Sequence, residues 1–418
     1  MPLRRLCLLL IALWSLVALG QDCDSLPAPH RADSLPVSLP AASAHRLDRF
    51  TNTRLYRATH VAVPLILVGQ IVKYEDAKFR TLRFNYLPEF HRHVDDYLQY
   101  SPAALMLGLK LGGAEGRSSW GRMLTSHAFA VALMTATVNG LKYTTHVTRP
   151  DGSANNSFPS GHTATAFMTA TMLNREYGRR YPWLAMAGYA AATSTGVMRM
   201  ANNRHWLSDV LTGAGIGILS TELGYYLADL IFRDRGLHSP CSDEVFAGHP
   251  SFLALYMGIN APLAAYNTKH NVTLQTAPGA TAGLEGAYFF NHHLGVGGRF
   301  TASNVRIASQ GAVDDIVAAD FLTFSAGGYY SAPLSRRWLV GSKLLAGVAH
   351  YPAFSLAQVQ VSHHHGLCLG TGLSLTFKSH AHYGMRFFVD YDLHPNFSPA
   401  PRHNNSWLTY GAAFTMLL

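Results

Sequence analysis

The hydrophobic pattern of this chain changes its period near residue 240, and no other feature constrains the fold as strongly. From about residue 56 to residue 232, apolar residues gather in segments of helical length, rich in Ala, Leu, Met and Thr. After Gly248, apolar and polar residues alternate in shorter segments that are rich in glycine and aromatic side chains. At 418 residues the chain is also longer than one ordinary domain. The sequence therefore predicts an all-α domain over residues 55–240, followed by an all-β domain over residues 249–418.

Six segments of the first domain have the length and composition of helices. Proline residues stand between them, where they break a helix or occupy its first turn. We expect these six helices to pack as a bundle. Their approximate ranges are 56–73, 97–112, 122–143, 160–177, 183–199 and 206–233.

The second domain carries eight amphipathic segments separated by loops rich in Asn, Asp, Pro and His. Eight such strands, with aromatic residues near their ends, resemble the small barrels of Gram-negative outer membranes. We therefore expect an eight-stranded antiparallel β-barrel whose interior is filled by side chains, with a soluble β-sandwich as the alternative. The strands are expected at 252–258, 283–290, 294–300, 321–331, 338–350, 366–377, 382–391 and 407–417.

The N-terminus has the pattern of a secretory signal peptide. Two arginines precede the apolar run 6–19, and small residues follow at the cleavage positions. We expect residues 1–20 to be the signal peptide and residues 21–54 to be an N-terminal segment of the exported chain. The apolar run is short for the alternative, an uncleaved anchor helix. Export to an oxidising compartment would allow Cys23 and Cys241 to form a disulfide, or both could remain free thiols.

The charge balance bears on the partners. The formal net charge of +9 at pH 7 favours anionic partners such as phosphate-bearing lipids or a negatively charged membrane face. Nucleic acid is the other anionic class, but the chain resembles no nucleic-acid module and has no lysine-rich arm. We therefore expect a phosphorylated lipid and a membrane as partners, and no nucleic acid. The sequence indicates no oligomeric state.

Three blocks of the helical domain supply groups that suit a phosphate-binding site. A transferring phosphoryl group spreads negative charge over its oxygens, so catalysis needs several fixed positive or donor groups around it. Lys142, Arg149 and Arg199 supply three charges, and the two arginines can grip oxygens in a bidentate way. Ser160 and Gly161 follow a proline and open a helical segment, so their backbone N–H groups can point at an anion.

Two histidines and one carboxylate supply the covalent chemistry. His205 and Asp209 are four residues apart, so on a helix they share one face. The carboxylate fixes the imidazole tautomer and leaves the other ring nitrogen free to attack phosphorus. His162 can protonate the departing alcohol oxygen and later activate the water that releases phosphate from His205. This two-step hydrolysis requires no metal and no cofactor.

In order and spacing, the blocks 142–150, 158–162 and 199–209 resemble the signature of the type-2 phosphatidic acid phosphatase family, which shares its oxyanion pocket with vanadate-dependent haloperoxidases. That signature is lysine, six residues and Arg-Pro; then Pro-Ser-Gly-His; then arginine, five residues, histidine, three residues and aspartate. All of these positions match. Met198 stands where the family usually has serine. The resemblance covers about residues 55–235 and implies the roles given above.

The resemblance, the export signal and the barrel together predict a phosphatase that removes a phosphate monoester from a membrane lipid, with lipid A as the preferred substrate. The resemblance extends equally to phosphatases of undecaprenyl pyrophosphate, of phosphatidylglycerol phosphate and of soluble phosphate esters. A vanadate haloperoxidase and a non-enzymatic barrel protein are the remaining alternatives.

The location follows from the order of the two domains. Residues 123–141 and 181–198 are uncharged and nearly long enough to cross a bilayer, but Thr, Ser, Asn, Gly and His dilute them. Several membrane-spanning helices would hold the chain in the inner membrane and hinder delivery of a barrel outward. We therefore expect an outer-membrane barrel with a periplasmic catalytic domain. The alternative is an inner-membrane enzyme whose active site faces the periplasm.

Overall fold

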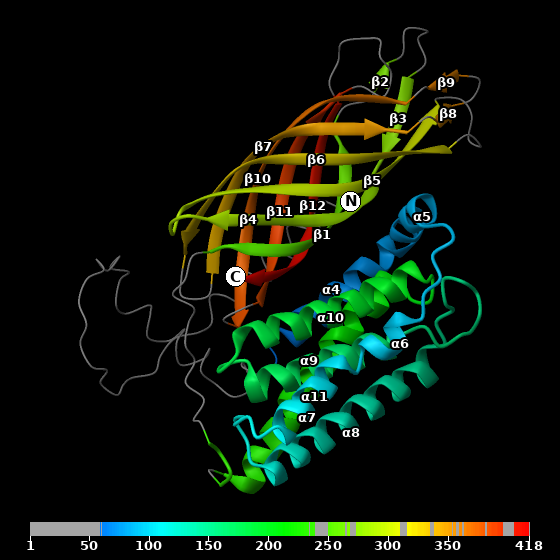
Figure 1. The fold of residues 1–418 in the computed structure, drawn as a ribbon. Helices are drawn as coiled ribbons and strands as arrows, with labels where there is room; N and C mark the ends of the chain where they lie inside the picture. Colours follow the sequence, from blue (N-terminus) through cyan, green and yellow to red (C-terminus); the bar gives the residue numbers. More distant parts are fainter. Residues whose placement is uncertain are drawn as a thin grey trace, which may run out of the picture.

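In the computed structural model, a helical domain and a β-domain lie side by side (Figure 1). The predicted signal peptide, the segment 21–54 and both Cys23 and Cys241 fall outside the residues that the structure describes. Those residues are 59, 61–233, 235–238, 250–263, 266–267, 273–309, 316–334, 338–352, 354–356, 359–361, 363–380, 383–395 and 405–417.

The six predicted helices are all present. They are α4 (Ala62–Val72), α7 (Ser101–Leu111), α8 (Trp120–Thr145), α9 (Gly161–Tyr177), α10 (Pro182–Ala201) and α11 (Leu207–Phe232). Two further helices were not predicted, namely α5 (Asp76–Tyr86) and the short α6 (Val94–Leu98). A 3-10 turn, η1 (Lys73–Glu75), joins α4 to α5. Both additional helices turn out to carry residues that contact the candidate site.

Helix α11 is the central helix of the bundle, and glycines bring it close to α9. A Cβ atom on Gly213 would lie 2.5 Å from the carbonyl oxygen of Ser160, and one on Gly217 would lie 2.2 Å from that of Ala164. Only glycine permits such an approach of two backbones. The start of α9 is therefore held directly against the first turns of α11, which brings the second and third sequence blocks together.

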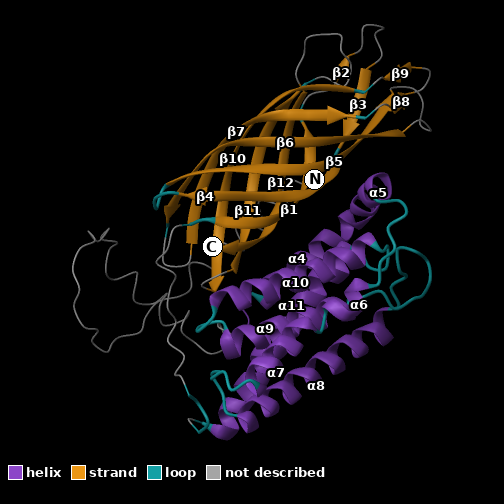
Figure 2. Cartoon of the chain, in the orientation of Figure 1, coloured by secondary structure: helices purple, strands orange, loops and turns teal. Residues whose placement is uncertain are grey.

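The β-domain is a closed barrel of eight antiparallel strands (Figure 2). Strand β1 pairs with both β4 and β12, and β5 pairs with β6, so that the sheet has no free edge among these eight strands. This closure confirms the predicted barrel and excludes the β-sandwich. The strands are β1 (Phe252–Pro262), β4 (Gly279–Phe289), β5 (Leu294–Ser309), β6 (Ile316–Pro333), β7 (Trp338–Tyr351), β10 (His364–His380), β11 (Tyr383–His394) and β12 (Asn405–Leu417).

Four short strands lie near one end of the barrel, in its longer connections (Figure 1). They are β2 (Tyr266–Asn267), β3 (Thr273–Ala277), β8 (Phe354–Leu356) and β9 (Val359–Val361). Strand β3 pairs with the last residues of β5, beyond the point where β4 pairs with it, and β2 pairs with β3.

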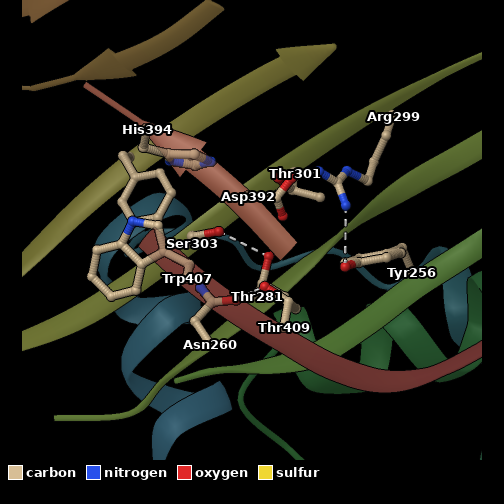
Figure 3. A pocket seen from close by; sticks show the side chains of 11 residues that line it. Tyr256, Asn260, Thr281, Arg299, Thr301, Ser303, Asp392, His394, Trp407 and Thr409 are labelled. Carbon is tan, nitrogen blue, oxygen red and sulfur yellow. Dashed lines mark hydrogen bonds and ion pairs between the residues drawn. The ribbon is translucent and has the colours of Figure 1, made fainter. Parts of the chain in front are cut away.

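The barrel interior is filled by side chains, many of them charged. Arg299 Nη1 lies 2.7 Å from Asp390 Oδ2, and Lys343 Nζ lies 2.8 Å from the same oxygen. Lys343 Nζ also lies 2.9 Å from Glu285 Oε1. Figure 3 shows a polar pocket in this interior, where Arg299 Nη1 donates to the hydroxyl of Tyr256 at 3.4 Å. The interior therefore holds an ion-pair network, as expected for a barrel with too few strands to enclose a channel.

Side chains on the outer wall of the barrel are largely apolar. Leu284, Tyr288, Phe324, Leu344 and Leu367 are all between 52% and 83% exposed. Alternation of a polar interior with an apolar exterior is typical of barrels whose outer face contacts lipid.

One sector of this outer wall is covered by the helical domain. Ile259 of β1 and Ala280 of β4 are buried in a cluster with Phe79, Leu82 and Leu207. Further along the wall, Met385 of β11 joins a second cluster with α4, α9, α10 and α11, against which Phe387 and Phe414 pack. The rings of Phe414 and Phe167 meet edge to face with centroids 6.0 Å apart. The bundle therefore packs against the side of the barrel.

Candidate active site

The candidate nucleophile, His205, lies in the connection between α10 and α11 and is 4% exposed. Its Nδ1 lies 3.4 Å from Asp209 Oδ2 and 3.4 Å from Ser157 Oγ. Ser157 Oγ donates to Asp209 Oδ2 at 2.5 Å, and the backbone N–H of Trp206 donates to the same oxygen at 2.9 Å. These contacts occupy the Nδ1 side of the imidazole and leave Nε2 as the free ring nitrogen.

The structure corrects one detail of the sequence reasoning about this pair. His205 and Asp209 do not share a helical face, because α11 begins at Leu207 and His205 precedes it. Asp209 stands at the third position of α11, and its carboxylate turns back toward the chain before the helix. The carboxylate therefore caps the helix and orients the histidine at the same time.

Burial sets the protonation state of His205. Removal from water lowers the pKa of His205 to about 4, and the positive charges of Arg199 and Lys142 act in the same direction. Asp209 opposes this shift through its hydrogen bond and its charge, but does not cancel it. The imidazole is consequently neutral at neutral pH, which is the form that can act as a nucleophile.

Three cationic residues from separate elements surround this imidazole. Lys142, in the last turn of α8, donates from Nζ to the carbonyl oxygen of Asn156 at 2.5 Å. Arg149 lies in the loop between α8 and α9, and burial together with the neighbouring Arg199 and Arg204 lowers the pKa of Arg149. Arg199 lies in the last turn of α10 and pairs through Nη1 with Asp95 Oδ2 at 2.8 Å.

Some of the donors on these cations remain unused. Within the described part of the chain, Arg149 Nε and Arg199 Nε are buried and have no hydrogen-bond partner. Buried donors without partners are rare and costly in folded proteins. An oxyanion bound beside His205 would satisfy them.

The start of α9 supplies backbone donors at the same place. Ser160 is the N-cap of α9, where its Oγ accepts from the backbone N–H of Thr163 at 3.4 Å. The backbone N–H of Ser160 donates to the carbonyl oxygen of Asp209 at 3.1 Å, which ties the second block to the third. This bond uses the Ser160 N–H, so the expectation that it binds the anion is wrong. The following N–H groups, of Gly161 and His162, have no partners inside the helix and can bind an anion. A Cβ atom on Gly161 would lie 3.9 Å from Lys142 Cε, so the lysine side chain passes beside this helix start.

His162, the candidate general acid and base, sits at the mouth of the site. Its Nε2 lies 2.8 Å from Asp96 Oδ1, and the two side chains are 31% and 43% exposed. Burial alone would raise the pKa of Asp96, but the hydrogen bond and charge of His162 and the charge of Arg199 lower it below its usual value. Asp96 is therefore ionised and holds one ring nitrogen of His162, while the other nitrogen remains available for proton transfer.

The structure thus gathers all eight predicted site residues at one end of the bundle, and it adds four that the sequence did not indicate. Ser157 completes the hydrogen bonds around Asp209. Asp95 and Asp96 look like ordinary helix-start residues in the sequence, and they do lie in the first turn of α6, but they pair with Arg199 and His162. The segment 93–98 is too short to show a helical period.

Asp76, the first residue of α5, is the fourth addition. Its Oδ1 accepts from the backbone N–H of Ser208 at 3.0 Å, and its Oδ2 accepts from the Ser208 hydroxyl at 2.5 Å. Burial raises the pKa of Asp76 to about 6, although the hydrogen bonds from Ser208 act to lower it. This carboxyl group fastens α5 to the segment that carries His205 and Asp209.

Two negative findings apply to the described residues alone. They contain no group of three or more His, Cys, Asp or Glu side chains arranged to hold a metal ion. Among their helices, α8 is the one that is long and apolar enough to cross a membrane by length and composition.

The fold and the site define a helical domain in which cationic side chains and a helix N-terminus gather beside a buried histidine. Residues 123–233, within the helical domain, match the PAP2 superfamily, and a closed eight-stranded barrel follows them in the chain. Over 204 residues it is 45% identical to a lipid A 1-phosphatase of Porphyromonas gingivalis (strain ATCC 33277). That alignment covers 49% of this chain and 45% of the relative, so the chain spans less than half the length of the curated protein it matches.

Solved structures resemble each domain separately. The LpxE structure from Aquifex aeolicus is 24% identical, with 35% of this chain and 91% of that chain covered and a TM-score of 0.28. The outer membrane protein OprG from Pseudomonas aeruginosa is 12% identical, with 42% of this chain and all 100% of that chain covered and a TM-score of 0.33.

Proposed function

We propose that this protein is a phosphatase that hydrolyses a phosphate monoester of a membrane lipid, with lipid A as the preferred substrate, through a phosphohistidine on His205. The observation that carries the proposal is the convergence of three cationic side chains and a helix N-terminus around a buried, neutral imidazole. The PAP2 domain supports the reaction class, and the P. gingivalis relative, whose name is lipid A 1-phosphatase, supports the substrate.

In the first step the phosphate ester binds with its oxygens facing Lys142, Arg149, Arg199 and the backbone N–H groups at the start of α9. His205 attacks phosphorus through Nε2, and the bond from phosphorus to the ester oxygen breaks. Burial and the charge of Arg199 lower the pKa of His162, while Asp96 opposes this shift, so the protonated form that serves as the general acid is favoured as the pH falls below neutral. In that form His162 gives its proton to the ester oxygen, and the lipid leaves as a neutral alcohol. The imidazole becomes cationic as it takes the phosphoryl group, and the carboxylate of Asp209 stabilises this charge.

In the second step His162, now neutral, removes a proton from a water molecule that attacks the phosphohistidine. The bond from phosphorus to nitrogen breaks, inorganic phosphate leaves, and both histidines return to their starting states. Asp96 keeps His162 in one orientation through both proton transfers. The charges that stabilise the transferring group all come from side chains and backbone, so neither step requires a metal ion.

We further propose that the barrel anchors the enzyme in an outer membrane. An apolar outer wall, a charged interior and closure without free edges support this location. An inner-membrane enzyme is the alternative, and fractionation of a Gram-negative host on a density gradient would separate the two.

The test compares the wild type with His205→Ala in detergent, with EDTA present. Phosphate release is measured from lipid A, from undecaprenyl pyrophosphate, from phosphatidylglycerol phosphate and from p-nitrophenyl phosphate. His127→Gln serves as a control, because His127 is a partly buried histidine that contacts Tyr225. We expect loss of activity in His205→Ala alone, and an acid-labile phosphoenzyme in the wild type.

Equal activity of the wild type and His205→Ala would refute the nucleophile. Preference for another of the lipids over lipid A would refute the substrate but not the mechanism. Activity that appears only with vanadate and peroxide would replace the proposal with a haloperoxidase.

A further inference from the structure

The way in which the bundle docks on the barrel fixes the direction in which the active site faces. Leu207 follows His205 by two residues and packs with Ile259, near the end of β1, and with Ala280, near the start of β4. Ile218, further along α11, lies in a cluster with Met385, near the start of β11. The bundle therefore runs alongside the barrel, and its catalytic end is level with the barrel end where β1 finishes and β4 begins.

The two ends of the barrel differ in their connections. The strand pairs β4–β5, β6–β7 and β10–β11 are joined by residues 290–293, 334–337 and 381–382. The pairs β5–β6, β7–β10 and β11–β12 are joined by the longer segments 310–315, 352–363 and 395–404. The longer connections lie at the end where β1 finishes, which is the end level with His205. In outer-membrane barrels the short turns face the periplasm and the longer loops face the exterior.

A second and independent observation concerns the outside of the bundle. Residues 62–72, 101–109, 123–141, 182–198 and 210–221 contain no Asp, Glu, Lys or Arg, so all of α4, most of α7 and α10, and long stretches of α8 and α11 bear no formal charge. The exposed side chains there include Leu67, Leu124, Val131 and Val197, at 40–53% exposure. Other exposed side chains there, such as Gln70, Thr135 and Asn139, are polar but uncharged. A surface without charge is expected of helices that face hydrocarbon, where ionised side chains are rare.

Charged and aromatic side chains gather instead near the ends of the helices. At the catalytic end, α6 and the residues flanking it expose Val94, Tyr97 and Tyr100, at 56%, 79% and 56% exposure. Tyrosine is enriched where a membrane meets water, because its ring is apolar and its hydroxyl is polar. The catalytic end thus has the surface expected at the level of lipid headgroups.

From these two observations we propose that the bundle and the barrel lie side by side in one outer membrane, with the catalytic end at the outer surface. The enzyme then acts on phosphate groups of lipids in the outer leaflet. This inference rests on the proposed outer-membrane location, and it replaces the periplasmic catalytic domain expected from the sequence. In this arrangement the packing of the bundle against the barrel keeps the catalytic end at the depth of the lipid headgroups.

The test uses two single-cysteine variants of the full chain, in a background where Cys23, Cys241 and Cys368 are replaced by serine. Tyr97→Cys probes the catalytic end. Trp183→Cys probes the other end of the bundle, because Trp183 is 64% exposed and lies near the start of α10, whereas Arg199 lies near its end. Both variants are treated with a membrane-impermeant maleimide, first on intact Gram-negative cells and then after permeabilisation.

We expect Tyr97→Cys to be labelled on intact cells and Trp183→Cys to be labelled only after permeabilisation. The reverse pattern would show that the catalytic end faces the periplasm. Labelling of both variants only after permeabilisation would show that both ends of the bundle lie on the periplasmic side of the outer membrane. Labelling of both on intact cells would show that the bundle does not cross the membrane. Each of these three outcomes overturns the proposal.

Phosphate release from lipid A by the same variants in detergent separates this proposal from the proposed function. Active protein with the wrong labelling pattern would overturn the orientation alone. The expected labelling pattern in a protein without phosphatase activity would overturn the proposed function alone.

Discussion

The contact between Asp96 and His162 leads to a prediction that separates leaving-group catalysis from phosphate binding. Asp96→Asn keeps the size of the side chain but removes the charge that faces His162 Nε2 at 2.8 Å. Hydrogen bonds to charged groups contribute about 1.5–3 kcal/mol when they are well buried. Because these side chains are 43% and 31% exposed, we take a value just below this range, about 1.4 kcal/mol, which corresponds to a tenfold change in rate.

The substrate decides whether this loss is visible. A lipid alcohol is a poor leaving group and needs the proton from His162, whereas p-nitrophenolate leaves readily without one. We therefore expect Asp96→Asn to lower kcat about tenfold on lipid A and to leave kcat on p-nitrophenyl phosphate nearly unchanged. Steady-state kinetics on both substrates in the same detergent would measure the two ratios. Glu115→Gln is the matched control, because it removes an exposed carboxylate that pairs with Arg180 at 3.3 Å.

Two results would refute this reasoning. An equal loss of kcat on both substrates would mean that Asp96 acts on the phosphoryl group itself, or on the fold around it. No loss on either substrate would mean that His162 is oriented without Asp96. His162→Ala should show the same contrast between substrates in a larger form, since general acid catalysis contributes about 10²- to 10⁴-fold.

Three further predictions follow from contacts in and around the bundle. Asp95→Ala should destabilise the protein by about 3 kcal/mol in thermal unfolding, the low end of the cost of breaking a buried ion pair, because Arg199 keeps only the more distant carboxylate of Asp96 at 3.7 Å; an unchanged midpoint would contradict this. Gly217→Ala should cost about 1–3 kcal/mol in the same assay, because the new Cβ would lie 2.2 Å from a carbonyl oxygen of α9. Gly140→Ala, with nothing within 4 Å, should instead be neutral or stabilising. The acid limb of kcat/KM should lie near the pKa of His205, about 4. Between pH 6.5 and pH 4 the histidine is protonated in the unfolded state but not in the folded state, so the free energy of unfolding should fall as the pH falls. This fall should be less steep in His205→Gln, which has no imidazole to protonate.

The elements of this fold could be predicted because each domain repeats one simple period over many residues. Helical segments such as 206–233 and alternating segments such as 338–350 agree with α11 and β7 to within a few residues. Helix α5 was not predicted although Phe79, Leu82 and Tyr86 follow a helical spacing, because four polar or charged residues stand among them. Helix α6 has only five residues and could not have shown a period.

The site residues divide in the same way. The eight predicted residues stand at fixed spacings inside three blocks, so the sequence alone was sufficient to propose them as a site. Asp76 and Asp96 lie 132 and 66 residues away from their partners Ser208 and His162, and no local pattern connects them. A carboxylate in the first turn of a helix is favoured in any protein by the helix dipole, so its presence there did not suggest a second role.

The packing of the bundle against the barrel could not be predicted from the sequence for a different reason. Outward-facing residues such as Ile259, Met385 and Phe414 are apolar whether they contact lipid or another part of the protein, so their pattern is the same in both cases. The structure shows that they contact the bundle. A chain cut between the domains would therefore expose these residues on the barrel and their partners, such as Leu207 and Phe167, on the bundle. The separated bundle, kept in detergent, should then unfold at a lower temperature than the full chain even though it keeps every predicted catalytic residue, because the contacts of these clusters are lost. An unchanged midpoint would show that the barrel serves only as an anchor.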